Sequence, residues 1–185
     1  MARRRFFDDH AAMTSAADLF GIQGRKALVV GGGYGMGRET SLHLALAGAD
    51  VAVADIDLSR AEGVCDEITA IGPKTFAFAA DVTDRGAAEG LVHAAHEALG
   101  GLDIVVNIVG AATFAPILDT DDAAWDAQHM LNVGQQLNVA RAAARLMIAA
   151  KTPGAIAMVA SVSGIYAAPL HGAYGAAKAA VMAAV

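Results

Sequence analysis

The chain has 185 residues, of which 56% are hydrophobic and 17% are charged, and its formal net charge is −6. This length and apolar content suffice for a buried core, and the acidic balance excludes the extended basic surface that nucleic acid or anionic lipid requires. Cys65 is the only cysteine, which excludes an intramolecular disulfide and any cysteine cluster for zinc or iron–sulfur ligation. We therefore expect a cytoplasmic protein whose partners are small molecules or copies of itself.

The first twenty residues have the character of an extension. Their basic cluster loosely resembles a twin-arginine leader, but Asp8, Asp9 and His10 stand where a secretory signal has an apolar run. We interpret residues 1–20 as a solvated N-terminal extension that need not be ordered, and residues 21–185 as one domain. No run of residues reaches the roughly 18 apolar positions of a membrane span. The pair His93 and His96 lacks a second group of ligands, so we expect no metal site.

From residue 26 onward, apolar runs alternate with segments of helical periodicity. Five runs have the character of strands, at residues 26–31, 50–55, 74–81, 102–107 and 154–161. Helical spacing occupies residues 38–47, 58–71, 84–99 and about 121–150, and a further helix opens at residue 172. This alternation predicts an α/β fold, a doubly wound Rossmann-type parallel sheet with helices on both faces. In such a sheet, ligands bind at the carboxyl ends of the strands.

A glycine-rich turn follows the first strand. Gly31, Gly35 and Gly37 have the spacing G-x-x-x-G-x-G between that strand and the next helix. Without β-carbons the backbone can adopt positive φ and approach a pyrophosphate closely, while the helix offers free N–H groups and the positive end of its dipole. The turn therefore predicts a dinucleotide phosphate site. The alternative is a flexible turn that binds nothing.

Two acidic residues close the next two strands. Asp55 follows Gly37 by eighteen residues, where a carboxylate can accept hydrogen bonds from both hydroxyls of an adenosine ribose and repel a 2′-phosphate. We therefore favour NAD over NADP. The alternative is that Asp55 caps the following helix, a role for which Asp57 competes. Asp81 is placed to meet the adenine, directly or through the backbone of Val82, although a turn or N-cap aspartate explains it almost as well.

The last helix begins with the pattern Y-x-x-x-K, which places Tyr174 and Lys178 on one face. A phenol, with a pKa near 10, exchanges protons poorly at pH 7, and a neighbouring ammonium favours the phenolate. Ser161 ends the fifth strand, so a loop can bring its hydroxyl to the phenol; Ser163 is its rival, and turn chemistry is the alternative for both. Asn132 lies in the long helix, where an asparagine is more often a local irregularity or a satisfied core amide.

Together these residues resemble the short-chain dehydrogenase/reductase family, from about Phe20 to the final residue. The family's glycine motif, its N-N-A-G motif after the fourth strand and its catalytic residues match here in chain order. The resemblance implies a catalytic tetrad of Asn132, Ser161, Tyr174 and Lys178. It implies contacts with the cofactor from Gly31, Gly33, Tyr34, Gly35, Met36, Gly37, Asp55, Ile56, Asp81, Val82, Asn107, Gly110, Tyr174 and Lys178.

The resemblance also implies a reaction. Tyr174 would exchange a proton with an alcohol or carbonyl oxygen that Ser161 polarises. Lys178 would hold the nicotinamide ribose and lower the pKa of the phenol, and Asn132 would anchor a water that relays protons to solvent. The implied function is hydride transfer between NAD(H) and a secondary alcohol or ketone. The alternative is a non-catalytic NAD-binding remnant of such an enzyme.

The chain departs from the family pattern in two places. Val30 stands where a threonine usually precedes the glycines, and Ile108 and Val109 replace the second asparagine and the alanine of N-N-A-G. Both changes remove hydrogen bonds that tie loops to the sheet, so we expect less rigid loops and unchanged chemistry. Family members continue well beyond the catalytic lysine, so we expect a C-terminally truncated piece that lacks the last strands of an enzyme assembling as a dimer or tetramer. The substrate and the direction of reaction stay open.

Overall fold

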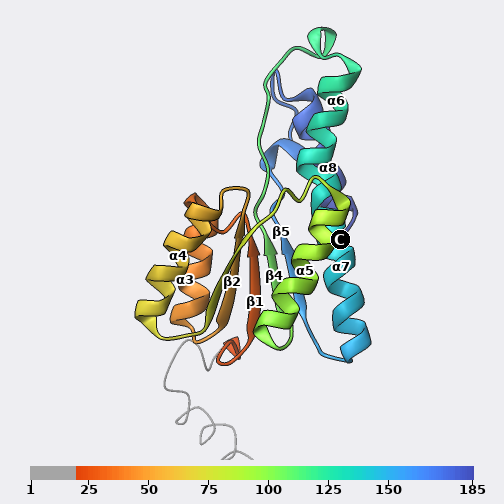
Figure 1. The fold of residues 1–185 in the computed structure, drawn as a ribbon. Helices are drawn as coiled ribbons and strands as arrows, with labels where there is room; N and C mark the ends of the chain where they lie inside the picture. Colours follow the sequence, from red (N-terminus) through yellow and green to blue (C-terminus); the bar gives the residue numbers. More distant parts are fainter. Residues whose placement is uncertain (1–19) are drawn as a thin grey trace, which may run out of the picture.

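The computed structural model describes residues 20–185, so the expected extension of residues 1–20 lies almost wholly outside the described residues. One sheet holds five strands, which are β1 (Lys26–Val30), β2 (Asp50–Asp55), β3 (Thr75–Ala79), β4 (Ile104–Asn107) and β5 (Ala155–Met158). Every neighbouring pair is parallel, and the strand order is β3-β2-β1-β4-β5 (Figure 1). The predicted doubly wound sheet is confirmed.

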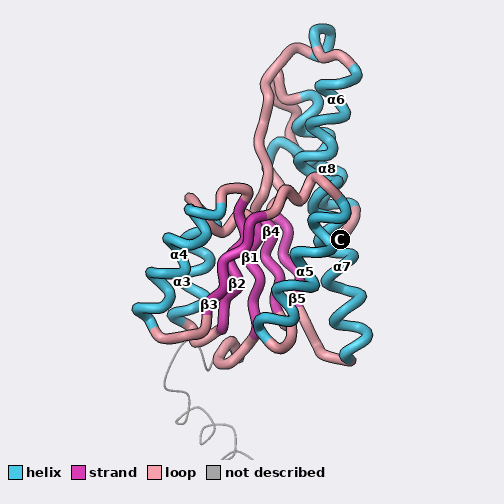
Figure 2. The backbone as a smooth tube through the Cα atoms, in the orientation of Figure 1, coloured by secondary structure: helices cyan, strands magenta, loops and turns pink. Residues whose placement is uncertain are grey.

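Helices cover both faces of the sheet. They are α3 (Gly35–Leu46), α4 (Leu58–Ile71), α5 (Arg85–Leu99), α6 (Asp122–His129), α7 (Gln135–Ala150) and α8 (Gly172–Ala183). Helices α3 and α4 lie on one face and α5 and α7 on the other, while α6 rises beyond the carboxyl ends of the strands (Figure 2). Within residues 20–185, no helix combines the length and the apolar character needed to cross a bilayer.

Successive side chains of the central strand β1 point to opposite faces of the sheet, and both faces are buried. Leu28 and Val30 belong to the core cluster that packs against α5 and α7, whereas Ala27 and Val29 belong to the cluster against α3 and α4. All four side chains are at most 2% exposed. Because successive residues of a strand point to opposite faces, an uninterrupted apolar run is the pattern that a sheet covered on both sides requires. The central strand is therefore held from both faces, and its carboxyl end is a fixed platform.

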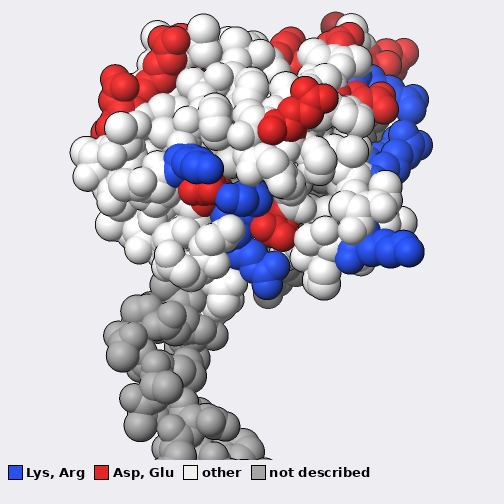
Figure 3. Space-filling view, turned by 60° about the horizontal axis from the view of Figure 1, so that its bottom comes forward, with Lys and Arg blue, Asp and Glu red and all other residues white. Residues whose placement is uncertain are grey.

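The charges on the surface are mixed. On the face shown in Figure 3, lysine and arginine side chains are interspersed with aspartate and glutamate, and they form no continuous basic surface there. Two ion pairs, Lys26–Asp50 and Arg25–Asp103, lie at the amino ends of the strands. This distribution accords with the acidic balance of the sequence.

The long helix expected at residues 121–150 is interrupted. Helix α6 ends at His129, a π-helical turn covers Met130–Gly134, and α7 continues from Gln135. Asn132 lies in this turn, and its Nδ2 donates to the carbonyl oxygens of Gln128 (3.0 Å) and Ala111 (2.8 Å). A side-chain amide that bonds a helix carbonyl competes with the regular backbone ladder, and π turns of this kind often mark functional sites.

Candidate active site

A cleft opens at the carboxyl ends of β1, β2, β3 and β4, as the fold predicts. Its wall comes from the ends of these strands, the loops that follow them and the first turns of α3 and α4, together with Leu131 of the π-helical turn. Nine of the residues predicted to contact a cofactor line it, and these are Gly31, Tyr34, Gly35, Met36, Asp55, Ile56, Asp81, Val82 and Gly110. Five other predicted residues do not line it, and these are Gly33, Gly37, Asn107, Tyr174 and Lys178.

The glycine turn has the backbone that the sequence predicts. Gly31 and Gly35 have positive φ values, +78° and +54°, which are costly for residues with a side chain. A β-carbon on Gly37 would overlap the carbonyl oxygen of Gly31, so this position excludes every other residue. The N-cap of α3, Tyr34, makes no side-chain capping bond, and the first turn of α3 holds no acidic residue. The free N–H groups of this helix end therefore suit a phosphate.

Asp55 faces the glycine turn and does not cap the helix. Its Oδ2 accepts from the backbone N–H of Gly33 (3.1 Å), and its Oδ1 accepts from that of Asp57 (3.2 Å). The cap of α4 is Asp57, whose Oδ1 accepts from the N–H of Ser59 at 3.0 Å. Asp55 is 9% exposed. Its carboxylate oxygens, each with one protein donor, keep lone pairs that can accept from ligand hydroxyls.

Asp81 forms a turn and lines the cleft, and its expected contact with the adenine stays a prediction. Its Oδ1 accepts from the N–H (3.0 Å) and the hydroxyl (2.6 Å) of Thr83, and these bonds lower its pKa. The N-cap of α5 is Asp84, not Asp81. Val82 is buried in the core beneath α5 and also lines the cleft. Asp81 therefore shapes a turn at the wall of the cleft, where its second oxygen is available.

Two glutamines that sequence reasoning missed tie the loops after β4 and β5. Gln135 accepts from Asn107 Nδ2 (2.8 Å) and donates to the carbonyl of Val109 (2.8 Å). Gln136 donates to the carbonyl of Val159 at 3.2 Å. Both glutamines are 0% exposed. They supply hydrogen bonds at the loop where Ile108 and Val109 depart from N-N-A-G, and the expected loss of rigidity there stays a prediction. The changes at Ile108 and Val109 were the sequence signal that could have pointed to the two glutamines.

Asn132 is completely buried beside the loop after β4. Its Nδ2 is satisfied by two backbone carbonyls, but its Oδ1 has no hydrogen-bond partner among the described residues. A β-carbon on Gly110 would lie 2.9 Å from this oxygen and 3.0 Å from Lys178 Nζ. The absence of a side chain at Gly110 thus leaves room for the ends of these two side chains. Asn132 is the local irregularity that was considered, and its catalytic role stays a prediction.

Lys178 is the buried cation of the site, at 2% exposed. Its Nζ donates to the carbonyl oxygen of Val159 (2.8 Å) and lies 5.9 Å from the centre of the Tyr174 ring. Burial lowers the pKa of this ammonium below its ordinary value. Helix α8 places the two residues one turn apart, as their spacing predicts. The structure therefore brings Tyr174, Lys178 and Asn132 together.

The two serines after β5 differ in their partners. Ser161 Oγ accepts from the N–H of Ser163 (3.2 Å) and caps the short 3₁₀ turn Val162–Gly164. Ser163 Oγ contacts His171 Nδ1 at 2.9 Å. His171 in turn stacks on Phe114, with ring centres 4.5 Å apart, and meets the edge of Tyr174. Ser163 is therefore engaged elsewhere, and His171 and Phe114 form a wall beside Tyr174 that sequence reasoning missed.

Comparison with known proteins identifies the family of this chain. A family model described as short chain dehydrogenase matches residues 25–185. A sorbitol dehydrogenase of Cereibacter sphaeroides is 36% identical over 161 residues, which are 87% of this chain and 62% of that protein. An L-xylulose reductase of Mesocricetus auratus is 34% identical, with 83% of this chain and 60% of that protein covered.

Solved structures share the fold. A 7α-hydroxysteroid dehydrogenase, solved with NADH and 7-oxo glycochenodeoxycholic acid, has a TM-score of 0.85 and 30% identity, covering 89% of this chain and 64% of that one. A structure from Sinorhizobium meliloti, described as a putative short-chain alcohol dehydrogenase, has a TM-score of 0.84 and 36% identity, covering 88% and 64%. The chain spans 57% and 62% of the first two curated relatives. By the match of the family model and the shared fold, the chain belongs to the short-chain dehydrogenase family of oxidoreductases.

Proposed function

We propose that this chain is an NAD-dependent oxidoreductase that acts on a secondary alcohol or its ketone, with Tyr174 as the general acid or base. One observation carries the proposal. The buried ammonium of Lys178, one helical turn from Tyr174, shares the space outside Gly110 with the unpaired oxygen of Asn132. A buried cation and an orphaned acceptor beside a phenol are costly for stability, and such costs are typical of catalytic sites.

The cleft suits a dinucleotide. The uncapped end of α3 would hold the pyrophosphate, and Asp55, which retains free lone pairs, would accept from the hydroxyls of the adenosine ribose. Lys178 would hold the second ribose. When bound, the nicotinamide supplies the acceptor or donor of hydride. The carboxylate of Asp55 disfavours a 2′-phosphate, which is the reason for proposing NAD before NADP.

The side chains of this chain would then manage the proton and the substrate oxygen. Tyr174 would take the proton of an alcohol, or return it to a carbonyl oxygen. Ser161 would donate a hydrogen bond to the same oxygen, which stabilises the charge that develops there. The unpaired oxygen of Asn132 would accept from a water that also contacts the Lys178 ammonium, which gives the proton a route away from the phenol.

The test measures nucleotide binding and catalytic turnover in separate experiments. Binding of NADH is measured by its fluorescence, and oxidation of sorbitol, other sugar alcohols and 7-hydroxy bile acids with NAD is followed by absorbance. Tyr174→Phe should lower turnover by about 10²–10⁴-fold and leave NADH binding within about threefold, because the hydroxyl acts on the proton alone. Tyr166→Phe, which alters an exposed tyrosine in the segment before α8, is the control. Turnover by Tyr174→Phe at the native rate would refute the assignment, and NADH binding without any turnover would support the non-catalytic alternative.

A further inference from the structure

Arg60 lines the cofactor cleft beside Asp55. It lies in the first turn of α4, and it is the one lysine or arginine among the described residues of the cleft wall. Its β-carbon is 2.7 Å from the position that a β-carbon on Gly33 would occupy, and Asp55 Oδ2 is 2.9 Å from the same position. Both atoms therefore crowd the side of Gly33 on which a β-carbon would stand. The Arg60 side chain and the Asp55 carboxylate thus begin next to the same part of the glycine turn.

The guanidinium of Arg60 is weakly held. Its central carbon lies 5.9 Å from the centre of the Tyr34 ring, a residue that is 76% exposed. Its Nε lies 3.5 Å from Asp57 Oδ2, in an ion pair of two half-exposed side chains. Cation–π contacts and ion pairs of exposed side chains are weak, because water competes for both partners. Tyr34 and Asp57 thus orient the guanidinium over the cleft without occupying its donors fully.

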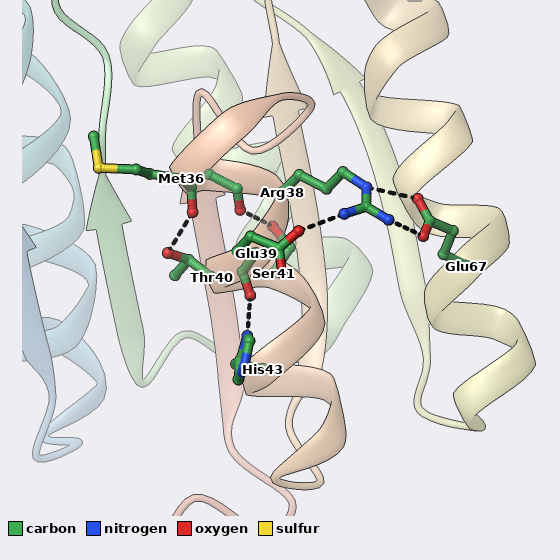
Figure 4. A network of polar contacts seen from close by, with 8 residues as sticks. Met36, Arg38, Glu39, Thr40, Ser41, His43 and Glu67 are labelled. Carbon is green, nitrogen blue, oxygen red and sulfur yellow. Dashed lines mark hydrogen bonds and ion pairs between the residues drawn. The ribbon is translucent and has the colours of Figure 1, made fainter.

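Arg38 provides the contrast. It follows the last glycine of the turn, but Figure 4 shows its guanidinium directed to α4, where it pairs with both oxygens of Glu67 and contacts Glu39. Its donors are committed to these carboxylates, and it does not line the cleft wall. Of the two arginines nearest the glycine turn, Arg60 is therefore the one available to a ligand.

We propose that Arg60 is a second cofactor-specificity residue, which with Tyr34 forms a subsite for a 2′-phosphate that the Asp55 carboxylate keeps closed. The inference rests on the proposed dinucleotide function and deepens it. Asp55 stands where the ribose hydroxyls would bind, so its charge repels a phosphate at that place. Arginine recognises phosphate through several fixed donors. Removal of the Asp55 charge alone should therefore turn the preference toward NADP, because the required cation is already present.

The test measures dissociation constants for NADH and NADPH by fluorescence, without any substrate. Asp55→Asn should tighten NADPH binding by about tenfold to a hundredfold, the range expected for hydrogen bonds to a charged group. In Asp55→Asn with Arg60→Leu this gain should disappear, and in Asp55→Asn with Arg60→Lys most of it should remain. Asp55→Asn with Arg38→Leu is the matched control and should retain the whole gain. Thermal unfolding of each variant checks that the substitutions leave the fold intact.

The outcomes are separable from those of the proposed function. The inference would be overturned if Asp55→Asn and Asp55→Asn with Arg60→Leu bound NADPH equally well. It would also be overturned if the gain in NADPH affinity disappeared with Arg38→Leu and not with Arg60→Leu. A native protein that binds neither reduced nucleotide would refute the proposed function itself. Adenosine 2′,5′-bisphosphate and adenosine 5′-monophosphate, which differ by the 2′-phosphate, give the same comparison without the nicotinamide half and should show the same dependence on Arg60.

Discussion

Asn132 and Lys178 converge on one point from different elements. The oxygen of Asn132 comes from the π-helical turn and the ammonium of Lys178 from α8, and they lie 2.9 and 3.0 Å from the place that a β-carbon on Gly110 would occupy. Gly110 belongs to the loop after β4. Three segments distant in sequence therefore form the site, and the space that they share exists because residue 110 has no side chain.

Gly110→Ala should damage function more than folding. The added methyl group would push against the ends of two side chains, which can move by a few tenths of an ångström, so we expect a loss of about 1–2 kcal/mol in unfolding free energy. Displacement of the catalytic groups should lower turnover by about tenfold or more. Gly90→Ala is the control, since its β-carbon would meet open space on α5, and it should raise stability by about 0.5–1 kcal/mol. Native turnover in Gly110→Ala would show that the convergence has no catalytic role.

Burial of Lys178 predicts a pH dependence of stability. Its pKa in the folded chain is below the ordinary value of 10.5, so between the two values the unfolded chain binds more protons. Stability therefore rises with pH through this window, and below the folded pKa, where both states hold the proton, the contribution of Lys178 no longer changes with pH. The gain is about 1.4 kcal/mol for each unit by which the pKa is lowered.

Urea unfolding between pH 7 and pH 10 tests this prediction. In Lys178→Met the contribution is absent, so the free energy of unfolding of the native chain should increase relative to that of the variant as the pH rises. Lys151→Met, which changes an exposed residue at the end of α7, should run parallel to the native chain. A difference between the native chain and Lys178→Met that stays constant with pH would contradict the lowered pKa.

The neighbouring glutamines should differ in their effect on stability. Gln135 makes hydrogen bonds at 2.8, 2.8 and 3.1 Å, whereas Gln136 donates at 3.2 and 3.5 Å and leaves its Oε1 without a partner among the described residues. Replacing Gln135 with leucine leaves buried groups unsatisfied and should cost about 2–4 kcal/mol, and Gln136→Leu should cost about 1 kcal/mol. Urea unfolding at one pH measures both, and a larger cost for Gln136→Leu would show that its bonds are undervalued.

Local patterns sufficed for much of the fold and for part of the site. The apolar runs predict the parallel sheet because they are buried on both faces, and the i, i+4 spacing of Tyr174 and Lys178 is a property of any helix. The interruption at Asn132 was harder to foresee. An asparagine in a helix predicts either an irregular turn or a buried amide with hydrogen-bond partners. The partner of Asn132 is the carbonyl of Ala111, which lies in another segment, so the sequence alone does not reveal this hydrogen bond.

Other roles depend on contacts that a sequence does not contain. Asp55 and Asp57 are both plausible caps for α4, and the choice follows from the approach of Gly33 to the end of β2. Gln135 reaches Asn107 across 28 positions, and Arg60 reaches Tyr34 across the cleft. The signal for Gln135 was indirect. A loop that loses its usual side-chain ties must find other partners for its buried backbone groups.

Ser161 and Ser163 offer a last discrimination, because their hydroxyls face different partners. Ser161→Ala removes the donor proposed for the substrate oxygen and should lower turnover by about 10²–10³-fold. Ser163→Ala releases His171 from its contact at 2.9 Å and should lower turnover by less than about tenfold. Since Ser161 also caps the 3₁₀ turn, Ser161→Thr, which keeps a hydroxyl, should recover part of the rate, and unfolding curves separate loss of the cap from loss of the donor. If Ser163→Ala proves the more damaging variant, the donor role passes to Ser163.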